Sequence, residues 1–597
     1  MTGGPSPEEV AGEFRTVSTS GYHTCLIGND DRLSCYGDEG AMPTAPGTPV
    51  PDPRTRATEG VPYERGIAVT STSPVELTIK GTLPAGLTLA PTEWGAPSPY
   101  VLTGIPTKRG TYRFTVVATN LFGASELPLV LRVLPPPGYD VNGDGIVDLP
   151  VGVPGQNKGS KADSGQVTVL LGAADGTYGR KGAQIIDQEV VGQRSETGDR
   201  FGAVITTGEI TGDTYVDLII AAPGEDKSAG QVVVVTGSAK GLAGGRRIVL
   251  RQGLAGAAGA AEAGDGFGSA VSVGEDGLWV GAPGENLGKA VDAGVVTRFP
   301  LPVKTAGSVQ FQQGALKVPG TSESGDRFGA SLAEGGTLIG APGEDVGRIV
   351  DAGAVTWRLR YGLTQDSPGV PGAAEKGDRF GAAVSSVTQW SQDGWEPSWT
   401  RNSMVGVGAP GEDIGAAADA GTVTFGSDEG FLGAGEDPDD GTTIVGLVDA
   451  RVESGDRFGS SVSVSEDATR MVVGAPREDV GATKDAGAVT AFAVSTWCDY
   501  YCDVSVDGRT TLDQNSAGVP GAARAGSQFG ATLVERPGAG NRGYVVGAPG
   551  ALVSGKTTAG TVITMPTTGL KQELHEISAG VPGAAAKGDR FGTLPGR

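Results

Sequence analysis

The chain has 597 residues, of which 101 are glycine, and 38% of the residues are hydrophobic. The glycines follow no every-third-residue pattern, which excludes collagen, and no apolar run reaches the roughly 18 residues that a membrane-spanning helix needs. A formal net charge of −23 argues against nucleic acid as a partner, because its phosphates would be repelled. These values fit an acidic protein that is able to bind cations.

The four cysteines form two local pairs, Cys25 with Cys35 and Cys498 with Cys502. We interpret both pairs as disulfides, and the alternative is four reduced thiols, as in a cytosolic protein. The first 30 residues lack the basic and apolar regions of a signal peptide. Because disulfides form outside the cytosol, we expect an extracellular or cell-surface location, although no export signal is visible in this chain.

Residues 1–55 contain two short β-like segments around the polar turn at residues 29–32, followed by a Pro-rich and Gly-rich linker. This spacing places Cys25 and Cys35 side by side across a hairpin. The segment resembles one repeat of the regulator of chromosome condensation family in its residues His23, Thr24 and Cys25 and then Cys35, Tyr36 and Gly37. A single unit cannot close a propeller, so we expect a remnant or a cap and carry over no exchange function.

Residues 56–136 alternate apolar and polar side chains at period two, which is typical of half-buried antiparallel strands. The stretches "LPAGLTLA" and "LTGIPTKRGTYRFTVVATNLFG" resemble the immunoglobulin-like domains of bacterial surface proteins. The resemblance implies a small β-sandwich that acts as a spacer. The proline run at 135–137 ends this module.

The sequence "DVNGDGIVD" follows, with oxygen-bearing side chains at Asp140, Asn142, Asp144 and Asp148 and an inward carbonyl expected at Ile146. Oxygen donors at alternate positions around a sharp Gly turn are what Ca²⁺ requires. An EF-hand would need an acidic twelfth position, which here is Val151, and flanking helices, which the prolines oppose. We predict a Ca²⁺ site, and a solvated acidic turn is the alternative.

A second copy of this frame reads "EITGDTYVD" and has oxygen donors at Glu209, Thr211, Asp213 and Asp217. It has Thr211 in place of Asn142 and lacks the central Gly of the first frame, so the sequence ranks it as the weaker Ca²⁺ site.

Two markers recur in fixed order from residue 137 to residue 597, a Phe-Gly pair and a Gly-Ala-Pro or related triplet. Each occurs seven times, at Phe201, Phe267, Phe328, Phe380, Phe458, Phe529 and Phe591, and at Pro154, Pro223, Pro283, Pro342, Pro410, Pro476 and Pro549. Short β-branched runs between the markers indicate strands that are buried on both faces. A repeat of this length favours a four-stranded antiparallel blade and a propeller.

The ends of this region complement one another. The first unit has Pro154 without a preceding Phe-Gly pair, and the last pair, Phe591-Gly592, has no proline after it. Together they make one complete unit, which predicts that the C-terminal strand pairs near residues 146–152 and closes the ring. The expected fold is all-β: a seven-bladed β-propeller closed by its N- and C-terminal strands, with an N-terminal Ig-like β-sandwich.

The two markers and the nine-residue acidic loop together resemble the FG-GAP repeats of the integrin α-subunit propeller over about residues 140–597. The resemblance implies a seven-bladed propeller that binds calcium through β-hairpin loops, and its best-known use is adhesion.

Acidic residues also recur in every unit, in the patterns Gly-Glu-Asp, Asp-Ala-Gly and Gly-Asp-Arg-Phe-Gly. If the Phe-Gly pair opens strand one and the proline ends strand two, these loops lie opposite the calcium loops. They form either a ring of cation-binding carboxylates or, in the interpretation we favour, Asp residues that accept backbone N–H groups in tight turns.

Two segments depart from the repeat. An insertion holds Trp390, Trp395 and Trp399, and "WCDYYC" presents Tyr500 and Tyr501 between two cysteines. Exposed aromatic clusters mark contacts with proteins or sugars, although a Trp-rich hairpin also packs on its own blade.

The chain has only two histidines, and neither has an evident Ser or Cys partner, so we expect no nucleophilic triad and no enzyme. The predicted function is an extracellular Ca²⁺-binding adhesion or ligand-binding propeller that recognises a protein or a polysaccharide. The alternatives are a propeller hydrolase or lyase that uses channel carboxylates, and a purely structural surface protein.

Overall fold

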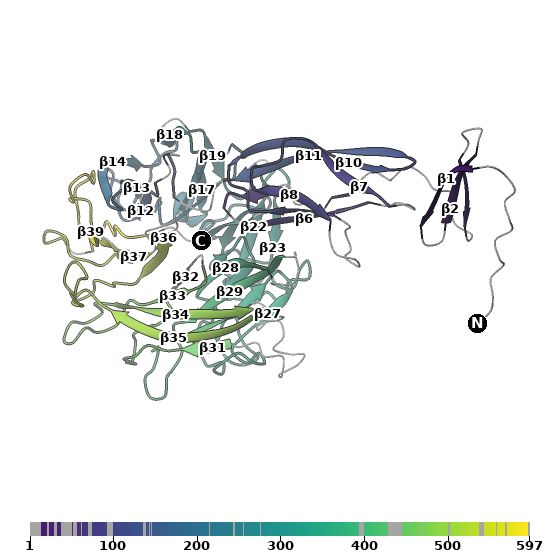
Figure 1. Ribbon diagram of the computed structural model, residues 1–597. Helices are drawn as coiled ribbons and strands as arrows, with labels where there is room; N and C mark the ends of the chain where they lie inside the picture. Colours follow the sequence, from purple (N-terminus) through teal and green to yellow (C-terminus); the bar gives the residue numbers. More distant parts are fainter. Residues whose placement is uncertain are drawn as a thin grey trace. The chain divides into compact units, whose positions relative to one another are not determined.

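The computed structural model describes residues 14–20, 23–28, 33–37, 50–51, 56–60, 62–69, 74–91, 100–134, 139–142, 144, 146–213, 215–242, 245–254, 256–274, 276–392, 399–427, 444–465, 467–498, 502–536, 543–556, 558–566 and 570–594. These residues form strands and turns almost exclusively (Figure 1). The one helical segment among them, α1 (Glu225–Ser228), has positive φ angles at Asp226 and Lys227 and is closer to a tight turn. The chain divides into two compact units, the first formed by Met1–Pro136 and Gly394–Trp399 and the second by Pro137–Asp393 and Thr400–Arg597.

The first unit starts with a three-stranded sheet of β1 (Phe14–Ser20), β2 (His23–Gly28) and β3 (Leu33–Gly37). The hairpin expected from the sequence is β2 and β3, and their register sets Cys25 opposite Cys35. Strand β1 was not predicted, and it pairs antiparallel with β2. Its sequence, "FRTVSTS", is polar apart from Phe14 and Val17 and carries only a weak strand signal.

A two-sheet sandwich follows. One sheet has the order β5-β11-β10-β7 and the other β4-β6-β9-β8. The strands are β4 (Val50–Pro51), β5 (Arg56–Thr58), β6 (Tyr63–Ala68), β7 (Glu76–Gly81), β8 (Leu87–Pro91), β9 (Tyr100–Gly104), β10 (Gly110–Asn120) and β11 (Gly123–Leu134). Alternate residues of β10, Phe114, Val116 and Ala118, enter a core shared by both sheets, as the period-two pattern predicts.

The second unit consists of seven successive sheets among the described residues. Sheets 1 to 3 contain β12 (Leu149–Val153), β13 (Gln166–Gly172) and β14 (Tyr178–Ile186); β15 (Val204–Gly208), β16 (Asp217–Ala222), β17 (Gln231–Val235) and β19 (Arg247–Leu250); and β20 (Ala270–Gly274), β21 (Gly277–Ala282), β22 (Val295–Phe299) and β23 (Val309–Phe311). The short strand β18 (Ala239–Leu242) precedes β19.

Sheets 4 to 7 repeat this plan. They contain β24 (Ser331–Ala333), β25 (Leu338–Ala341), β26 (Ala354–Trp357) and β27 (Tyr361–Leu363); β28 (Ala383–Gln392), β29 (Trp399–Ala409), β30 (Thr422–Ser427) and β31 (Ile444–Leu447); β32 (Ser461–Val464), β33 (Arg470–Ala475), β34 (Ala488–Cys498) and β35 (Cys502–Leu512); and β36 (Thr532–Arg536), β37 (Gly543–Ala548), β38 (Thr561–Pro566) and β39 (Gln572–Leu574). Sheets 2 to 7 have four strands in chain order, whereas sheet 1 has three.

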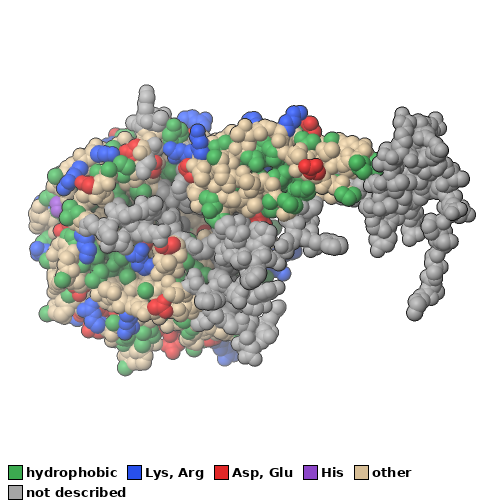
Figure 2. Space-filling model, viewed as in Figure 1, with side chains coloured by type: hydrophobic (Ala, Val, Ile, Leu, Met, Phe, Trp, Pro, Cys, Tyr) green, Lys and Arg blue, Asp and Glu red, His purple; other side chains and the backbone are tan. Residues whose placement is uncertain are grey.

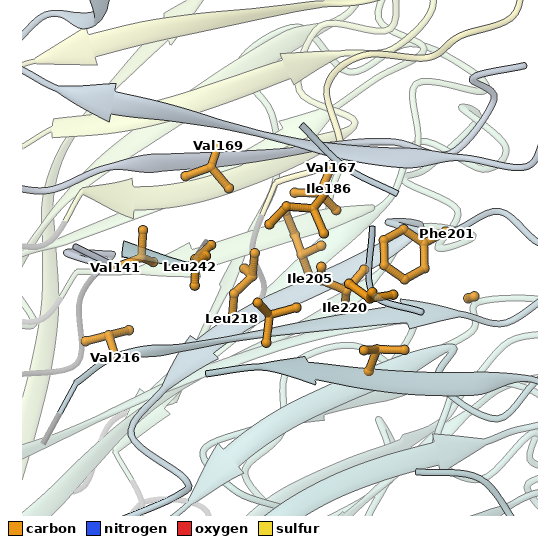
Figure 3. Close-up of a cluster of buried hydrophobic side chains, with 14 residues drawn as sticks. Val141, Val167, Val169, Ile186, Phe201, Ile205, Val216, Leu218, Ile220 and Leu242 are labelled. Atoms are coloured by element: carbon orange, nitrogen blue, oxygen red, sulfur yellow. The ribbon is translucent and has the colours of Figure 1, made fainter. Parts of the chain in front are cut away.

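Side chains from neighbouring sheets form the core of the second unit. The second and third strands of a sheet, such as β16 and β17, are buried along their whole length, as their continuous apolar runs predict. One cluster joins sheets 1 and 2 and contains Val169, Phe201 and Ile220 (Figure 3). Corresponding clusters join each following pair of sheets, from sheets 2 and 3 to sheets 6 and 7.

The Phe-Gly pair of each unit binds the preceding sheet. Each of the seven Phe side chains is fully buried and belongs to one of these clusters. The Phe N–H also donates a hydrogen bond to a carbonyl just before the third strand of the preceding sheet, as Phe328 does to Ala293 at 2.9 Å. The following Gly has a positive φ, 89° at Gly329, which a side chain would oppose. The marker therefore connects sheets.

Sheets 7 and 1 are connected in the same manner. A further cluster combines Val545 and Val562 of sheet 7 with Val151 and Val153 of sheet 1 and with Phe591. Thr593 forms an antiparallel bridge with Gly152 of β12, in which the Gly152 N–H donates to the Thr593 carbonyl at 2.8 Å. The C-terminal residues thus lie along the free edge of the three-stranded sheet.

Candidate functional site

The first acidic frame occupies the turn before β12. The Asp144 N–H donates to Asn142 Oδ1 at 2.8 Å and to Asp140 Oδ1 at 3.1 Å, and the Ile146 N–H donates to Asp144 Oδ1 at 2.9 Å. The loop therefore folds around its own oxygen donors. Lys181 lies 3.5 Å from Asp144 Oδ2 and offsets part of the negative charge.

Asp148, the last residue of this frame, is fully buried. Its Oδ2 accepts the Val141 N–H at 3.2 Å, and its Oδ1 accepts the Gly172 N–H at 3.0 Å, which ties the loop to β13. Burial raises the pKa of Asp148 to about 7, and the charges of Asp140 and Asp144 contribute to this shift. The first frame therefore places three carboxylates close together in a loop that is partly shielded from water.

The second frame connects β15 and β16 and repeats the same geometry. Asp217 is fully buried and accepts the Ile210 and Gly237 N–H groups, each at 3.0 Å, as Asp148 does for Val141 and Gly172. Burial raises the pKa of Asp217 to about 7. Asp213 Oδ1 accepts the Tyr215 N–H at 2.9 Å, and Glu209 Oε1 accepts the Asp213 N–H at 2.9 Å.

Two buried oxygens of the second frame have no hydrogen-bond partner, Glu209 Oε2 and Thr211 Oγ1. A buried acceptor without a donor is costly unless a cation or water satisfies it. The sequence ranks this frame below the first because Thr211 replaces Asn142 and the central Gly is missing, yet its two unsatisfied oxygens are of the kind that a cation would satisfy. Within the described residues, however, no three or more His, Cys, Asp or Glu side chains meet as a metal-binding group.

The aromatic candidates from the sequence are only partly placed. Trp390 lies near the end of β28 and Trp399 at the start of β29, which are neighbours in sheet 5. Trp395, Tyr500 and Tyr501 lie outside the described residues. The register of β34 and β35 sets Cys498 opposite Cys502. Both disulfides remain predictions, because the registers fix only the backbones.

The recurrent Asp residues act in turns. Asp351, Asp419 and Asp485 each donate their backbone N–H to the side chain of an Asp six residues earlier, at 2.9 Å. In six of the seven units an Asp stands two residues before the Phe-Gly pair and accepts the N–H of the residue three positions earlier, as Asp326 Oδ2 does from Glu323 at 2.5 Å. These contacts favour the turn interpretation over a ring of free carboxylates.

A second set of polar groups was missed in the sequence and lies between the sheets. Gln188, Gln252, Gln313 and Gln365, which follow the last strand of sheets 1 to 4, each donate an Nε2–H to a Glu of the next sheet at 2.5 Å. Their partners are Glu225, Glu285, Glu344 and Glu412, and burial raises the pKa of each Glu to about 7. The signal was the Glu that stands two residues after five of the seven marker prolines, which in a single copy resembles an ordinary loop residue.

On the face of the molecule seen in Figure 2, acidic and basic side chains of the described residues are interspersed. The net charge of −23 is therefore not gathered into one acidic surface on this face. None of the helices described is long and apolar enough to cross a membrane.

Family comparisons agree with the repeat structure. Models of the FG-GAP repeat match residues 201–235 and 444–492, and a model described as "Putative Ig domain" matches residues 45–133. The chain is an FG-GAP repeat protein with an Ig-like domain. The first match runs from the Phe-Gly pair at Phe201 to the end of β17, so it covers one marker set with the second acidic frame. The Ig match covers the sandwich of β4 to β11 except the end of β11.

No curated protein matches the chain. Among solved structures, an endo-fucoidan hydrolase of glycoside hydrolase family 107 is 18% identical over 35% of this chain and 34% of its own, with a TM-score of 0.14. A quinonprotein alcohol dehydrogenase-like protein from Bacteroides thetaiotaomicron is 9% identical over 63% of this chain and 91% of its own, with a TM-score of 0.19. The chain thus spans about a third of the hydrolase, and neither likeness supports a function.

Proposed function

We propose that residues 137–597 form a closed seven-bladed β-propeller, that its two acidic frames bind Ca²⁺, and that the protein binds a protein or polysaccharide ligand outside the cell or at its surface. The observation that carries the proposal is the unbroken succession of interfaces. Every sheet of the second unit shares a hydrophobic cluster with the next, and the cluster around Phe591 joins the last sheet to the first. Such a succession leaves no apolar sheet face without a neighbour.

The closing strand supports the same proposal. Sheet 1 lacks the first strand that every other sheet has, and Thr593 bridges to Gly152 at that edge. The Gly592 N–H also donates to the Gly152 carbonyl at 3.3 Å, and the Gly329 N–H makes the corresponding bond to Gly340 inside sheet 4 at 2.9 Å. The C-terminal residues therefore substitute for the missing strand.

Calcium would be held by the side chains of Asp140, Asn142, Asp144 and Asp148 with the Ile146 carbonyl, and by Glu209, Thr211, Asp213 and Asp217 with the Tyr215 carbonyl. Hard oxygen donors of this kind suit Ca²⁺. When bound, the ion would neutralise the clustered carboxylates and satisfy Glu209 Oε2 and Thr211 Oγ1. Its role in this proposal is structural, since it would fix the hairpins at one edge of sheets 1 and 2.

Ligand recognition is assigned to the segments that break the repeat. The Asp residues shared by the units are engaged in turns, so they are poor candidates for selective contacts. The hairpins β28–β29 and β34–β35 carry the aromatic residues that occur in no other unit. We propose no catalytic role, because Glu576 and Asp589 lie buried between sheets and acid pairs such as Asp413 and Asp419 are engaged in turns.

A binding panel tests the proposal. Immobilised full-length protein is exposed to an array of glycans and bacterial surface proteins, with Ca²⁺ or with a chelator. We expect retention of one ligand class, and we expect Trp390→Ala and Trp399→Ala to reduce it while leaving the melting curve unchanged. Cleavage of a polysaccharide on the array would instead support the hydrolase or lyase alternative. No retention in either condition would favour a purely structural protein.

A further inference from the structure

Three polar side chains recur between neighbouring sheets of the second unit. The first follows the last strand of one sheet, the second stands two residues before Phe-Gly, and the third stands two residues after the proline marker. At the first four interfaces these are a Gln, an Asp and a Glu, for example Gln365, Asp378 and Glu412 between sheets 4 and 5. The Gln Nε2–H binds the Glu carboxylate, and the Asp carboxylate binds a backbone N–H.

The interface between sheets 6 and 7 keeps the amide and has lost both acids. Gln514 occupies the Gln position and is 4% exposed, while Ser527 replaces the Asp and Ala551 replaces the Glu. The hydrophobic cluster around Phe529 is nevertheless intact, and the Gly550 N–H still bonds to the Ser527 carbonyl at 3.1 Å. The scaffold is thus preserved where the carboxylates are gone.

Two donors at this interface consequently lack the acceptors that their counterparts have. No described residue accepts a hydrogen bond from the Gln514 side chain, whereas the equivalent amide of Gln365 lies 2.5 Å from Glu412. Likewise, the N–H of Arg524 has no carboxylate, whereas the equivalent N–H of Glu453 bonds to Asp456 at 2.7 Å. The Gln514 side chain is buried and its Oε1 also has no hydrogen-bond partner, so this amide is unfavourable as it stands, whereas Arg524 lies at the surface.

The charge at position 524 is also reversed. Five other interfaces carry Glu there, at Glu196, Glu262, Glu323, Glu375 and Glu453. Arg524 is exposed and, in the described part of the chain, forms no ion pair. Compared with the other interfaces, this one has Ser527 and Ala551 in place of two buried acids. It also has the exposed cation Arg524 in place of a Glu.

A cavity of about 270 Å³ occupies this place. Its lining includes Gln514, Arg524, Ser527, Ala551, Glu573 and His575. A Cβ at Gly521 would lie 2.9 Å from Gln514 Nε2 and 3.2 Å from Glu573 Oε1, so these two groups border the same space. This space is partly open to solvent, and its polar lining suits a small organic acid.

We propose that this cavity, bounded by Gln514, Arg524 and Ala551, is a binding site for the carboxylate of a small organic acid such as a sugar acid. The carboxylate would take the place that Glu occupies at the other interfaces and accept from Gln514 Nε2–H. Arg524 would supply the charge-assisted contact. Glu573 is the opposing charge, and the His575 Nδ1 already lies 3.2 Å from Ser578 Oγ. The site does not rest on the proposed function, since it needs neither Ca²⁺ nor the aromatic hairpins.

Calorimetric titration of the full chain with glucuronate tests this site, with acetate as the smallest acid and glucose as the uncharged control. We expect glucuronate to bind and glucose to give no heat of binding, because glucose lacks the carboxylate. Acetate should also bind, more weakly, because it has the carboxylate but lacks the sugar ring. Arg524→Ala removes one charge-assisted contact and should weaken glucuronate by roughly tenfold or more. Glu573→Gln removes the opposing charge and should strengthen it.

The matched variant is Ala551→Glu, which restores the Glu that four other interfaces pair with a Gln. It should abolish glucuronate binding, and a melting curve at or above the parent's shows that it folds. If it does not fold, Arg524→Ala and Glu573→Gln still decide the question by moving the affinity in opposite directions. Equal heats for glucose and glucuronate, no heat for any acid, or unchanged affinity in the variants would overturn the proposal.

Discussion

Each buried Glu between the first five sheets lies beside an amide and close to an Asp carboxyl. Glu412 is 8% exposed, its Oε2 accepts from Gln365, and burial raises its pKa from the ordinary value of 4.5 to about 7, with Asp378 contributing. The folded state therefore holds a proton on this group more tightly than the unfolded chain does. Protonation of Glu412 stabilises the fold by this linkage.

The pH dependence follows from this sign. In the folded state the pKa of Glu225, Glu285, Glu344 and Glu412 is raised to about 7. The stabilisation of the folded state that comes from protonating these residues is therefore fully present below pH 4.5 and is lost as the pH rises through 7. We expect the melting temperature of the second unit to fall between pH 5 and pH 8. Replacing all four residues with Gln should flatten this fall in a calorimetric scan.

The exposed Glu76 of the sandwich is the control, and Glu76→Gln should leave the slope of melting temperature against pH unchanged. If the variant with all four Glu residues replaced by Gln has the same slope of melting temperature against pH as the parent, these Glu residues do not cause the pH dependence.

The sequence predicted the role of a repeated residue only where the partners of that residue lie close to it in the chain. The turn role of the Asp residues follows from spacing within a few residues. The assignment of oxygen donors in the two acidic frames rests on the same kind of local spacing and remains a prediction. The Gln–Glu pairs could not be predicted, because Gln365 and Glu412 belong to different sheets and only the fold brings them together. For the same reason, the local sequence around Ala551 did not indicate the loss of a Gln–Glu pair.

The strands follow from their sequences in most of the chain. Continuous apolar runs predicted buried strands such as β16 and β17, and strict alternation predicted β10. Strand β1 was missed because its residues are mostly polar, and β4 was missed because Val50 and Pro51 fall within the Pro-rich stretch expected to be a linker. Both strands depend on pairing with β2 and β6, which a local pattern does not contain.

The C-terminal segment is the element on which closure depends. Phe591 is fully buried, and Leu594 is 6% exposed in the same cluster. A chain that ends at Arg590 loses this burial and the Gly152–Thr593 bridge, and truncation of a buried Phe alone costs about 3–5 kcal/mol. We expect a large decrease in the free energy of unfolding of the second unit, measured by urea denaturation.

A chain that ends at Leu594 is the matched control, since it keeps every described residue of the segment. If both truncated chains unfold at the same urea concentration, the C-terminal segment contributes nothing to the ring.

For the whole molecule, the repeat explains the composition. Gly is frequent because the Phe-Gly pairs and the loops between strands require positive φ angles, as at Gly202 and Gly165. Part of the charge of −23 comes from acids that recur in most units, either buried between sheets or held in turns. Function is therefore best sought where one copy differs from the others: the two acidic frames, the aromatic hairpins and the interface at Ala551.

We propose that Ca²⁺ bound in the acidic frames stabilises the propeller, and melting curves recorded with Ca²⁺ and with a chelator test this role. We predict a higher midpoint with Ca²⁺, and we predict that Glu209→Gln combined with Thr211→Val, which removes donors of the second frame, reduces this difference. Asp276→Asn, in the corresponding turn of sheet 3, should leave it intact. A melting midpoint that the chelator does not change would contradict a structural role of Ca²⁺ in these frames.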